Sequence, residues 1–250
     1  QESRGLGDVY KRQDYLRTLK CAYLYGKTVT LVNTHWPETN AKMLKNRRIG
    51  LSQSGIVQAF KKHGRRVMLD WCDNAYDYVK ELDTEYSNWL CVPRSIKMTS
   101  IKPSGTVSLL NGSTPGIHFP EDEYYIRRIR FSNISPVLTA LKEAGYTIED
   151  DAYSPNTSVV EFPVKEEHFT KGKRDVSMWE QLEIAAQYQH YWADNAVSVT
   201  VTFTNEEASH TSSRSTRRLR GKTGRPADPA QPRRAVAVRA QLGCHRAASL

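Results

Sequence analysis

The sequence Lys102-Pro103-Ser104-Gly105-Thr106 directly follows a run of alternating apolar and polar residues, 96–101, and precedes another apolar run. Pro103 has no amide hydrogen to give to a sheet, so it ends a strand, and Gly105 lets the backbone approach a ligand closely. A hydroxyl of this stretch can cap a helix over residues 107–110, and the free amides of a helix N-terminus favour phosphate. The stretch predicts an anion-binding loop or, alternatively, a plain serine N-cap after a strand.

The rest of the chain reads as helices that alternate with strands. Helices are expected from Asp14, from Thr34 to near Arg48, from Gln53 to about Lys62, from Asp70 to about Leu90, from Ser135 to Ala144 and from Ser177 to about Trp192. Strands are expected at Ile49–Ser52, Met98–Lys102, Tyr124–Phe131, Thr157–Val164 and Asn195–Phe203. This alternation predicts an α/β fold with βαβ units and a mainly parallel sheet.

The cysteine pattern argues against a zinc site or a disulfide framework. The four cysteines, at positions 21, 72, 91 and 244, contain no Cys-x-x-Cys pair. Cys21, Cys72 and Cys91 lie in helix-like stretches and are expected to be small buried thiols. There is no apolar run of about 18 residues and no signal peptide, so neither a membrane span nor secretion is indicated.

Residues 209–250 account for the whole net charge of +9. They carry ten basic and one acidic side chain, whereas the first 208 residues carry 26 of each. With no Phe, Tyr, Trp, Ile or Met, this tail has too little apolar surface to fold and is predicted to be disordered. An Arg-rich arm could bind nucleic acid. A reading-frame error in G+C-rich DNA also explains the composition and is the favoured interpretation, so nucleic-acid binding is not inferred from the charge.

The first 13 residues are interpreted as non-native. Asp8–Gln13 back-translates to GATGTGTATAAGAGACAG, which looks like a transposon end used in preparing sequencing libraries. Residues 1–13 are therefore set aside as adapter-derived sequence, and an ordinary N-terminal extension is the alternative.

Five motifs in order carry a resemblance to a known family. They are Lys45–Ser52, Arg94–Leu110, Ser113–Pro120, Tyr124–Arg130 and Tyr191–Thr200. Together they closely resemble the adenosylcobalamin-dependent (class II) ribonucleoside-triphosphate reductases. The resemblance implies that residues 14–208 form the later part of the family's ten-stranded α/β barrel, between two disordered ends.

The resemblance also implies site residues. It assigns the substrate phosphates to Pro103, Ser104, Gly105, Thr106 and Val107, and part of the cobalamin site to His118, Phe119, Tyr125, Arg127 and Arg128. His118 could instead be packed or hydrogen-bonded, and the arginines, with Arg130, could simply alternate off a strand face. Asp194–Asn195 is expected to be a turn.

The implied activity is thioredoxin-dependent conversion of ribonucleoside triphosphates to deoxyribonucleoside triphosphates by thiyl radical chemistry in the cytoplasm. No cysteine here has the family's Asn-x-Cys-x-Glu context, and the C-terminal Cys pair is absent, so the isolated chain is predicted to be inactive. A deoxynucleotide effector and a monomeric intact enzyme are also implied. Two alternatives remain: a radical reductase with another cofactor, and a non-catalytic nucleic-acid-binding or adaptor protein that uses the basic tail.

Overall fold

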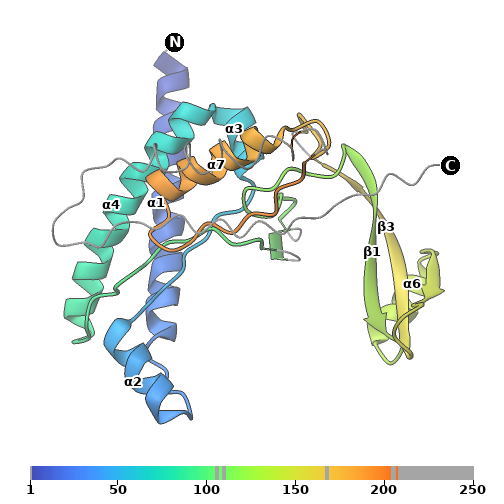
Figure 1. The fold of residues 1–250 in the computed structure, drawn as a ribbon, viewed down its shortest axis with the longest axis horizontal. Coiled ribbons are helices and arrows are strands. Elements are labelled where there is room, and N and C mark those ends of the chain that lie inside the picture. The colour runs from blue at the N-terminus through green and yellow to red at the C-terminus, as the bar shows by residue number, and fades with distance from the viewer. Residues whose placement is uncertain (1, 105–106, 109–110, 167–168, 204–206, 208–250) are drawn as a thin grey trace. The chain divides into compact units, whose positions relative to one another are not determined.

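The computed structural model describes residues 2–104, 107–108, 111–166, 169–203 and 207. The chain divides into two compact units (Figure 1). Unit 1 contains residues 1–119 and the part of the chain from Val176 onward, and unit 2 contains residues 120–175. None of the described helices is long and apolar enough to cross a membrane.

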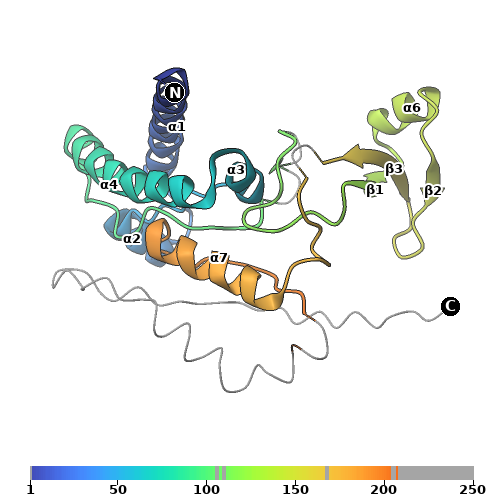
Figure 2. The same cartoon turned by 90° about the horizontal axis from the view of Figure 1, so that it is seen from above.

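Unit 1 is built on five helices with described bounds, which Figure 2 shows from a second direction: α1 (Glu2–Val29), α2 (Pro37–Asn46), α3 (Ile56–His63), α4 (Arg65–Trp89) and α7 (Met178–Tyr191). Helix α7 begins as predicted, because the Ser177 hydroxyl accepts a hydrogen bond from the Glu180 amide. Helices α2 and α3 also lie where the sequence predicts them.

Two predicted helix starts are wrong. Helix α4 begins at Arg65 rather than at Asp70, because Gly64 adopts φ 86° and separates α3 from α4 at that point. Helix α1 does not begin at Asp14 but runs back to Glu2, and the Thr18 hydroxyl donates to the Asp14 carbonyl inside it. Residues set aside as adapter-derived are therefore helical in the structure, while their origin in the DNA stays a prediction.

Helices α1 and α4 pack side by side and form much of the core of unit 1. Tyr15 stacks on Trp71 near one end of the pair, and Tyr23 stacks on Tyr86 further along. Side chains of α7 complete the core, with Tyr188 fully buried. Burial of such large apolar side chains, at about 1.5–3 kcal/mol each, is the main source of stability for this arrangement.

Three extended segments cross unit 1 beside these helices: residues 49–52, 98–102 and 195–203 (Figure 1). The sequence predicts each of them as a strand. The structure instead joins them by two isolated parallel bridges, Leu51 with Thr99 and Ile101 with Val197. A single bridge between two neighbouring segments does not make the continuous hydrogen-bond ladder of a sheet, so the predicted strands are extended segments and not regular strands. The predicted apolar face is nevertheless real, since Val197, Val199 and Val201 are all buried.

Unit 2 contains a three-stranded sheet and one helix, α6 (Pro136–Glu143). The strands β1 (Tyr124–Ser132), β2 (Ile148–Asp150) and β3 (Thr157–Lys165) lie in the order β1-β3-β2. All pairings are antiparallel, with Tyr124 opposite Lys165 and Ser132 opposite Thr157. The predicted strands at Tyr124–Phe131 and Thr157–Val164 are confirmed as β1 and β3, whereas β2 was not predicted and the expectation of a mainly parallel sheet is wrong for this sheet.

The expectation that three cysteines are buried holds for only one of them. Cys72 is buried, and burial raises the pKa of its thiol to about 11. Cys21 and Cys91 are exposed, Cys91 in a left-handed turn (φ 53°) just after α4. Helical spacing beside apolar residues does not establish which face a cysteine takes. Cys244 and the tail 209–250 lie outside the described residues.

Candidate functional site

The three parallel segments of unit 1 end in a row of polar side chains. Ser52, Lys102 and Ser198 lie across the carboxyl ends of the segments, and the Ser52 hydroxyl accepts a hydrogen bond from the Lys102 amide at 3.0 Å. The Lys102 ammonium donates to the Ser198 hydroxyl at 2.8 Å. Ser52 and Lys102 are exposed. In parallel α/β sheets, ligands bind beyond the carboxyl ends of the strands, so this end is the candidate site.

The loop predicted to bind anions starts from this row. Pro103 is exposed, and the hydroxyl of Ser104 lies 2.6 Å from that of Ser54, which follows the first segment. Val107 is exposed and starts a helical turn, with its amide 3.1 Å from the Ser104 carbonyl. Gly105 and Thr106 lie outside the described residues, as do Leu109 and Leu110. The structure thus brings a second serine, Ser54, to the loop, which the sequence analysis did not single out.

The loop of residues 114–118, here called the glycine loop, packs tightly against the backbone of Lys102 through Gly116. A Cβ on Gly116 would lie 2.9 Å from the Lys102 carbonyl oxygen, and Gly116 has φ 54°. Both the close approach and the left-handed conformation require glycine at this position. Thr114, two residues earlier, is tied to α3. The Gly55 amide donates to the Thr114 carbonyl, and the Thr114 amide donates to the Gln58 side chain.

His118 is hydrogen-bonded through both ring nitrogens. Its Nδ1 lies 2.9 Å from the Pro115 carbonyl oxygen, and its Nε2 accepts from the Thr200 amide at 3.0 Å. Nδ1 therefore carries the proton in the neutral ring. This arrangement ties the third segment to the glycine loop and leaves neither nitrogen for a metal. Phe119 packs against the core of unit 1.

The amino ends of the same segments are closed by buried polar groups. The Asp194 carboxylate accepts from the Met98 and Thr99 amides, both at 2.9 Å, and its side chain is almost fully buried. The Asn195 amide group donates to the carbonyls of Ile49 at 3.1 Å and Thr99 at 2.8 Å. Asp194–Asn195, expected as a local turn, therefore joins all three segments through hydrogen bonds to residues 95 to 146 positions earlier in the sequence. No local sequence signal indicates these partners.

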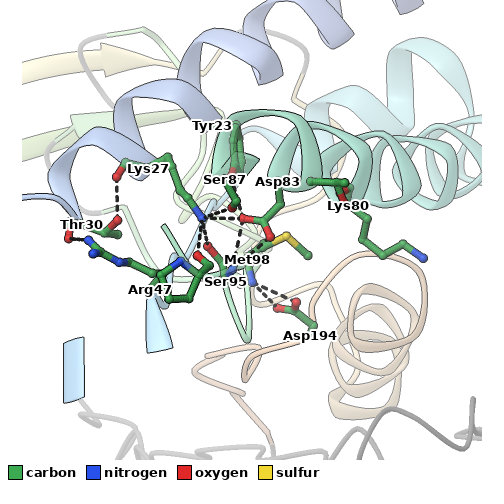
Figure 3. A network of polar contacts seen from close by, with 12 residues as sticks. Tyr23, Lys27, Thr30, Arg47, Lys80, Asp83, Ser87, Ser95, Met98 and Asp194 are labelled. Carbon is green, nitrogen blue, oxygen red and sulfur yellow. Dashed lines mark hydrogen bonds and ion pairs between the residues drawn. The ribbon is translucent and has the colours of Figure 1, made fainter. Parts of the chain in front are cut away.

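A second buried network lies beside this end (Figure 3). The Lys27 ammonium, fully buried, donates to Asp83 at 2.9 Å, Ser87 at 2.7 Å and Ser95 at 3.1 Å. Asp83 also accepts from the Tyr23 hydroxyl at 2.7 Å, and burial with this carboxylate raises the pKa of Tyr23 well above its ordinary value. The network anchors the chain that leads into the middle segment.

The candidate cofactor residues of unit 2 are engaged with one another or with acids. The Tyr125 hydroxyl donates to Glu166 at 2.7 Å, and burial together with this carboxylate raises the pKa of Tyr125 to about 12. Arg128 pairs with Glu149 and lies 3.5 Å from Glu161. Arg127 points to the other face of β1, since exposure alternates along the strand.

The neighbouring Arg130 is paired as well. Its guanidinium lies 3.0 Å from Asp151 and lowers the pKa of that carboxyl. Among the described residues, no three His, Cys, Asp or Glu side chains are grouped as metal ligands would be. The assignment of these side chains to the cobalamin site stays a prediction.

Comparison with known proteins gives the class of this fold and site. A crystal structure of a B12-dependent (class II) ribonucleotide reductase matches with a TM-score of 0.70 and 35% identity, over 78% of this chain and 31% of that one. No family model matches the sequence. The match places the described fold among the α/β folds of the ribonucleotide reductases.

Relatives found by sequence identify the family within the ribonucleotide reductases. An adenosylcobalamin-dependent ribonucleoside-triphosphate reductase of Euglena gracilis is 50% identical over 195 residues, which is 78% of this chain and 27% of the relative. A relative from Dictyostelium discoideum with a name of the same kind is 52% identical over 191 residues, 76% of this chain and 25% of the relative. The chain belongs to the adenosylcobalamin-dependent ribonucleoside-triphosphate reductases and spans about a quarter of the length of these relatives.

Proposed function

We propose that this chain supplies the substrate-phosphate loop of a ribonucleotide reductase that converts ribonucleoside triphosphates to deoxyribonucleoside triphosphates. The observation that carries the proposal is the placement of the loop. Pro103 and Ser104 follow the carboxyl end of the middle parallel segment, and Ser54 approaches Ser104 from the first. Parallel segments with hydroxyls and a lysine at this end have the chemistry that phosphate oxygens require.

In this proposal, the residues Pro103, Ser104, Gly105, Thr106 and Val107 bind the phosphates. The hydroxyls and backbone amides of the loop donate hydrogen bonds to phosphate oxygens, and the glycine allows the backbone to come close. A substrate held by its phosphates has a fixed ribose, and such positioning contributes strongly to enzymatic rates. The chain's own role is to bind and orient.

For the intact enzyme we infer adenosylcobalamin as the cofactor, because the relatives' names specify it. The homology also supports a ten-stranded α/β barrel to which the three parallel segments contribute. Thioredoxin as reductant, a deoxynucleotide effector, a cytoplasmic location and a monomeric state are parts of the same proposal. The 250-residue chain alone is expected to bind nucleotide without reducing it, since its cysteines lack the radical motif.

Substitution of Gly105 tests whether the loop of residues 103–107 binds the substrate phosphates. Gly105→Val is expected to lower the affinity of the chain for ATP at least tenfold, because a branched side chain blocks approach of the phosphates to the backbone. Equilibrium dialysis measures the affinity, and circular dichroism checks that the helices are retained. Ala144→Val is the control, since Ala144 lies exposed in unit 2 and its φ of −76° accommodates a branched side chain. Equal ATP affinity of the two variants contradicts the assignment.

A further inference from the structure

Lys102 is an exposed cation with a fixed backbone and no acidic partner. Its ammonium is 2.8 Å from the neutral hydroxyl of Ser198, and it forms no ion pair with any carboxylate in the described part of the chain. Two other lysines of unit 1 do have acidic partners: Lys27 pairs with Asp83, and Lys80 with Asp77 at 2.7 Å. The positive charge of Lys102 is therefore available to an anionic ligand.

The backbone of Lys102 is held on both sides. Its amide donates to the Ser52 hydroxyl at 3.0 Å, and its carbonyl lies against Gly116, where a Cβ would come within 2.9 Å of the oxygen. Pro103 follows and fixes the backbone direction through its ring. The flexible part of Lys102 is thus its four-carbon side chain, which carries a compact charge at the edge of the proposed phosphate loop.

Charge and hydrogen bonding make different contributions at such a site. Amides and hydroxyls bind phosphate oxygens as neutral donors and discriminate weakly between two phosphates and three. A lysine near the loop adds a formal charge, whose attraction grows with the negative charge of the ligand. Exchange of the Ser198 hydroxyl for a phosphate oxygen replaces a neutral acceptor with a charged one, which favours the bound state.

We propose that Lys102 determines the preference of the phosphate site for nucleoside triphosphates over nucleoside diphosphates by contacting the terminal phosphate. The inference rests on the proposed function of the loop and adds a specificity-determining residue to it. Ser198 holds the ammonium in place when no nucleotide is bound, and Ser52 and Gly116 hold the backbone.

The test measures binding of ATP and ADP to the 250-residue chain by isothermal titration calorimetry at low ionic strength. The unsubstituted chain is expected to bind ATP more tightly than ADP. Lys102→Gln is expected to weaken ATP binding about fivefold, the effect of one charge pair about 4 Å apart in water, and to change ADP affinity less than twofold. Lys102→Arg keeps the charge and is expected to keep most of the preference.

Lys62→Gln is the matched control, because it removes the same charge from the exposed C-terminal turn of α3. Its ratio of ATP to ADP affinity is expected to equal that of the unsubstituted chain. The ratio also separates recognition from folding, since a partly unfolded variant loses both affinities together.

Two results overturn the inference in distinguishable ways. If Gly105→Val abolishes binding while Lys102→Gln leaves the ATP-to-ADP ratio unchanged, the phosphate loop stands and the role of Lys102 is wrong. If the unsubstituted chain binds neither nucleotide, the proposed loop function and the inference both fail.

Discussion

The two ends of the three parallel segments use polar side chains in opposite ways. At the amino ends, Asp194 and Lys27 are buried, and their polar atoms are bonded to the protein itself. At the carboxyl ends, Ser52, Ser54 and Lys102 are exposed, with Ser52 bonded to the backbone of Lys102 and Ser54 to the hydroxyl of Ser104. The amino end therefore determines the register of the segments, and the carboxyl end offers groups that a ligand can take over.

This division has a physical basis. A buried charge is tolerated only when its hydrogen-bonding capacity is filled, so the amino end is stable only as a complete network. Exposed hydroxyls and ammonium groups exchange protein contacts for water or ligand at little cost. The same separation of a stabilising end and a binding end is found in other parallel α/β folds. The comparison predicts large stability effects at the amino end and small ones at the carboxyl end.

The largest effect is expected for Lys27→Met. The substitution leaves the Asp83 carboxylate buried without its cation, which typically costs about 3–5 kcal/mol of unfolding free energy. Urea unfolding followed by circular dichroism measures the loss. Lys80→Met on α4 is the control, because the Lys80–Asp77 pair is exposed and should contribute less than about 1 kcal/mol. Similar losses of unfolding free energy for both variants would show that the buried Lys27–Asp83 pair contributes no more to stability than an exposed pair.

A smaller loss is expected for Asp194→Ala. The buried amides of Met98 and Thr99 lose their acceptor, and two unsatisfied buried donors cost about 2–4 kcal/mol together. Asp70→Ala removes an exposed carboxylate from α4 and should change the unfolding free energy by less than about 0.5 kcal/mol. The same urea titration compares them. If the two variants have the same free energy of unfolding, the buried polar groups at the amino ends do not fix the register of the three segments.

Sequence reasoning found the elements that local signals specify. Ser177 and Glu180 predict the start of α7, and the alternation of Val197, Val199 and Val201 predicts a buried face, because cap and strand patterns act over a few residues. The loop after Lys102 is predicted from the same kind of local signal, and its role in phosphate binding stays a prediction. Its neighbour Ser54 was missed, since the contact with Ser104 depends on the pairing of two segments 50 residues apart.

The failures follow the same logic. Asp194–Asn195 lies at a bend, in agreement with the predicted turn, but the partners of Asp194, Met98 and Thr99, could not be predicted because only the tertiary fold brings them near. Asp70 looks like a helix cap, but Gly64 interrupts the chain earlier and α4 starts there. Antiparallel pairing in unit 2 was missed because alternation of helices and strands predicts sheet class only on average.

The smallest stability effect is expected for Ser54→Ala at the carboxyl end. The exposed hydroxyl makes one 2.6 Å contact with Ser104, and water replaces it, so the unfolding free energy should change by less than about 0.5 kcal/mol. If Ser54 also binds phosphate, ATP affinity should fall about three- to tenfold, the effect of one hydrogen bond to a charged group. Urea unfolding and equilibrium dialysis on the same preparation separate the two effects. A large stability loss without a change in ATP affinity would mean that Ser54 belongs with the stabilising end, and the contrast between the two ends would fail.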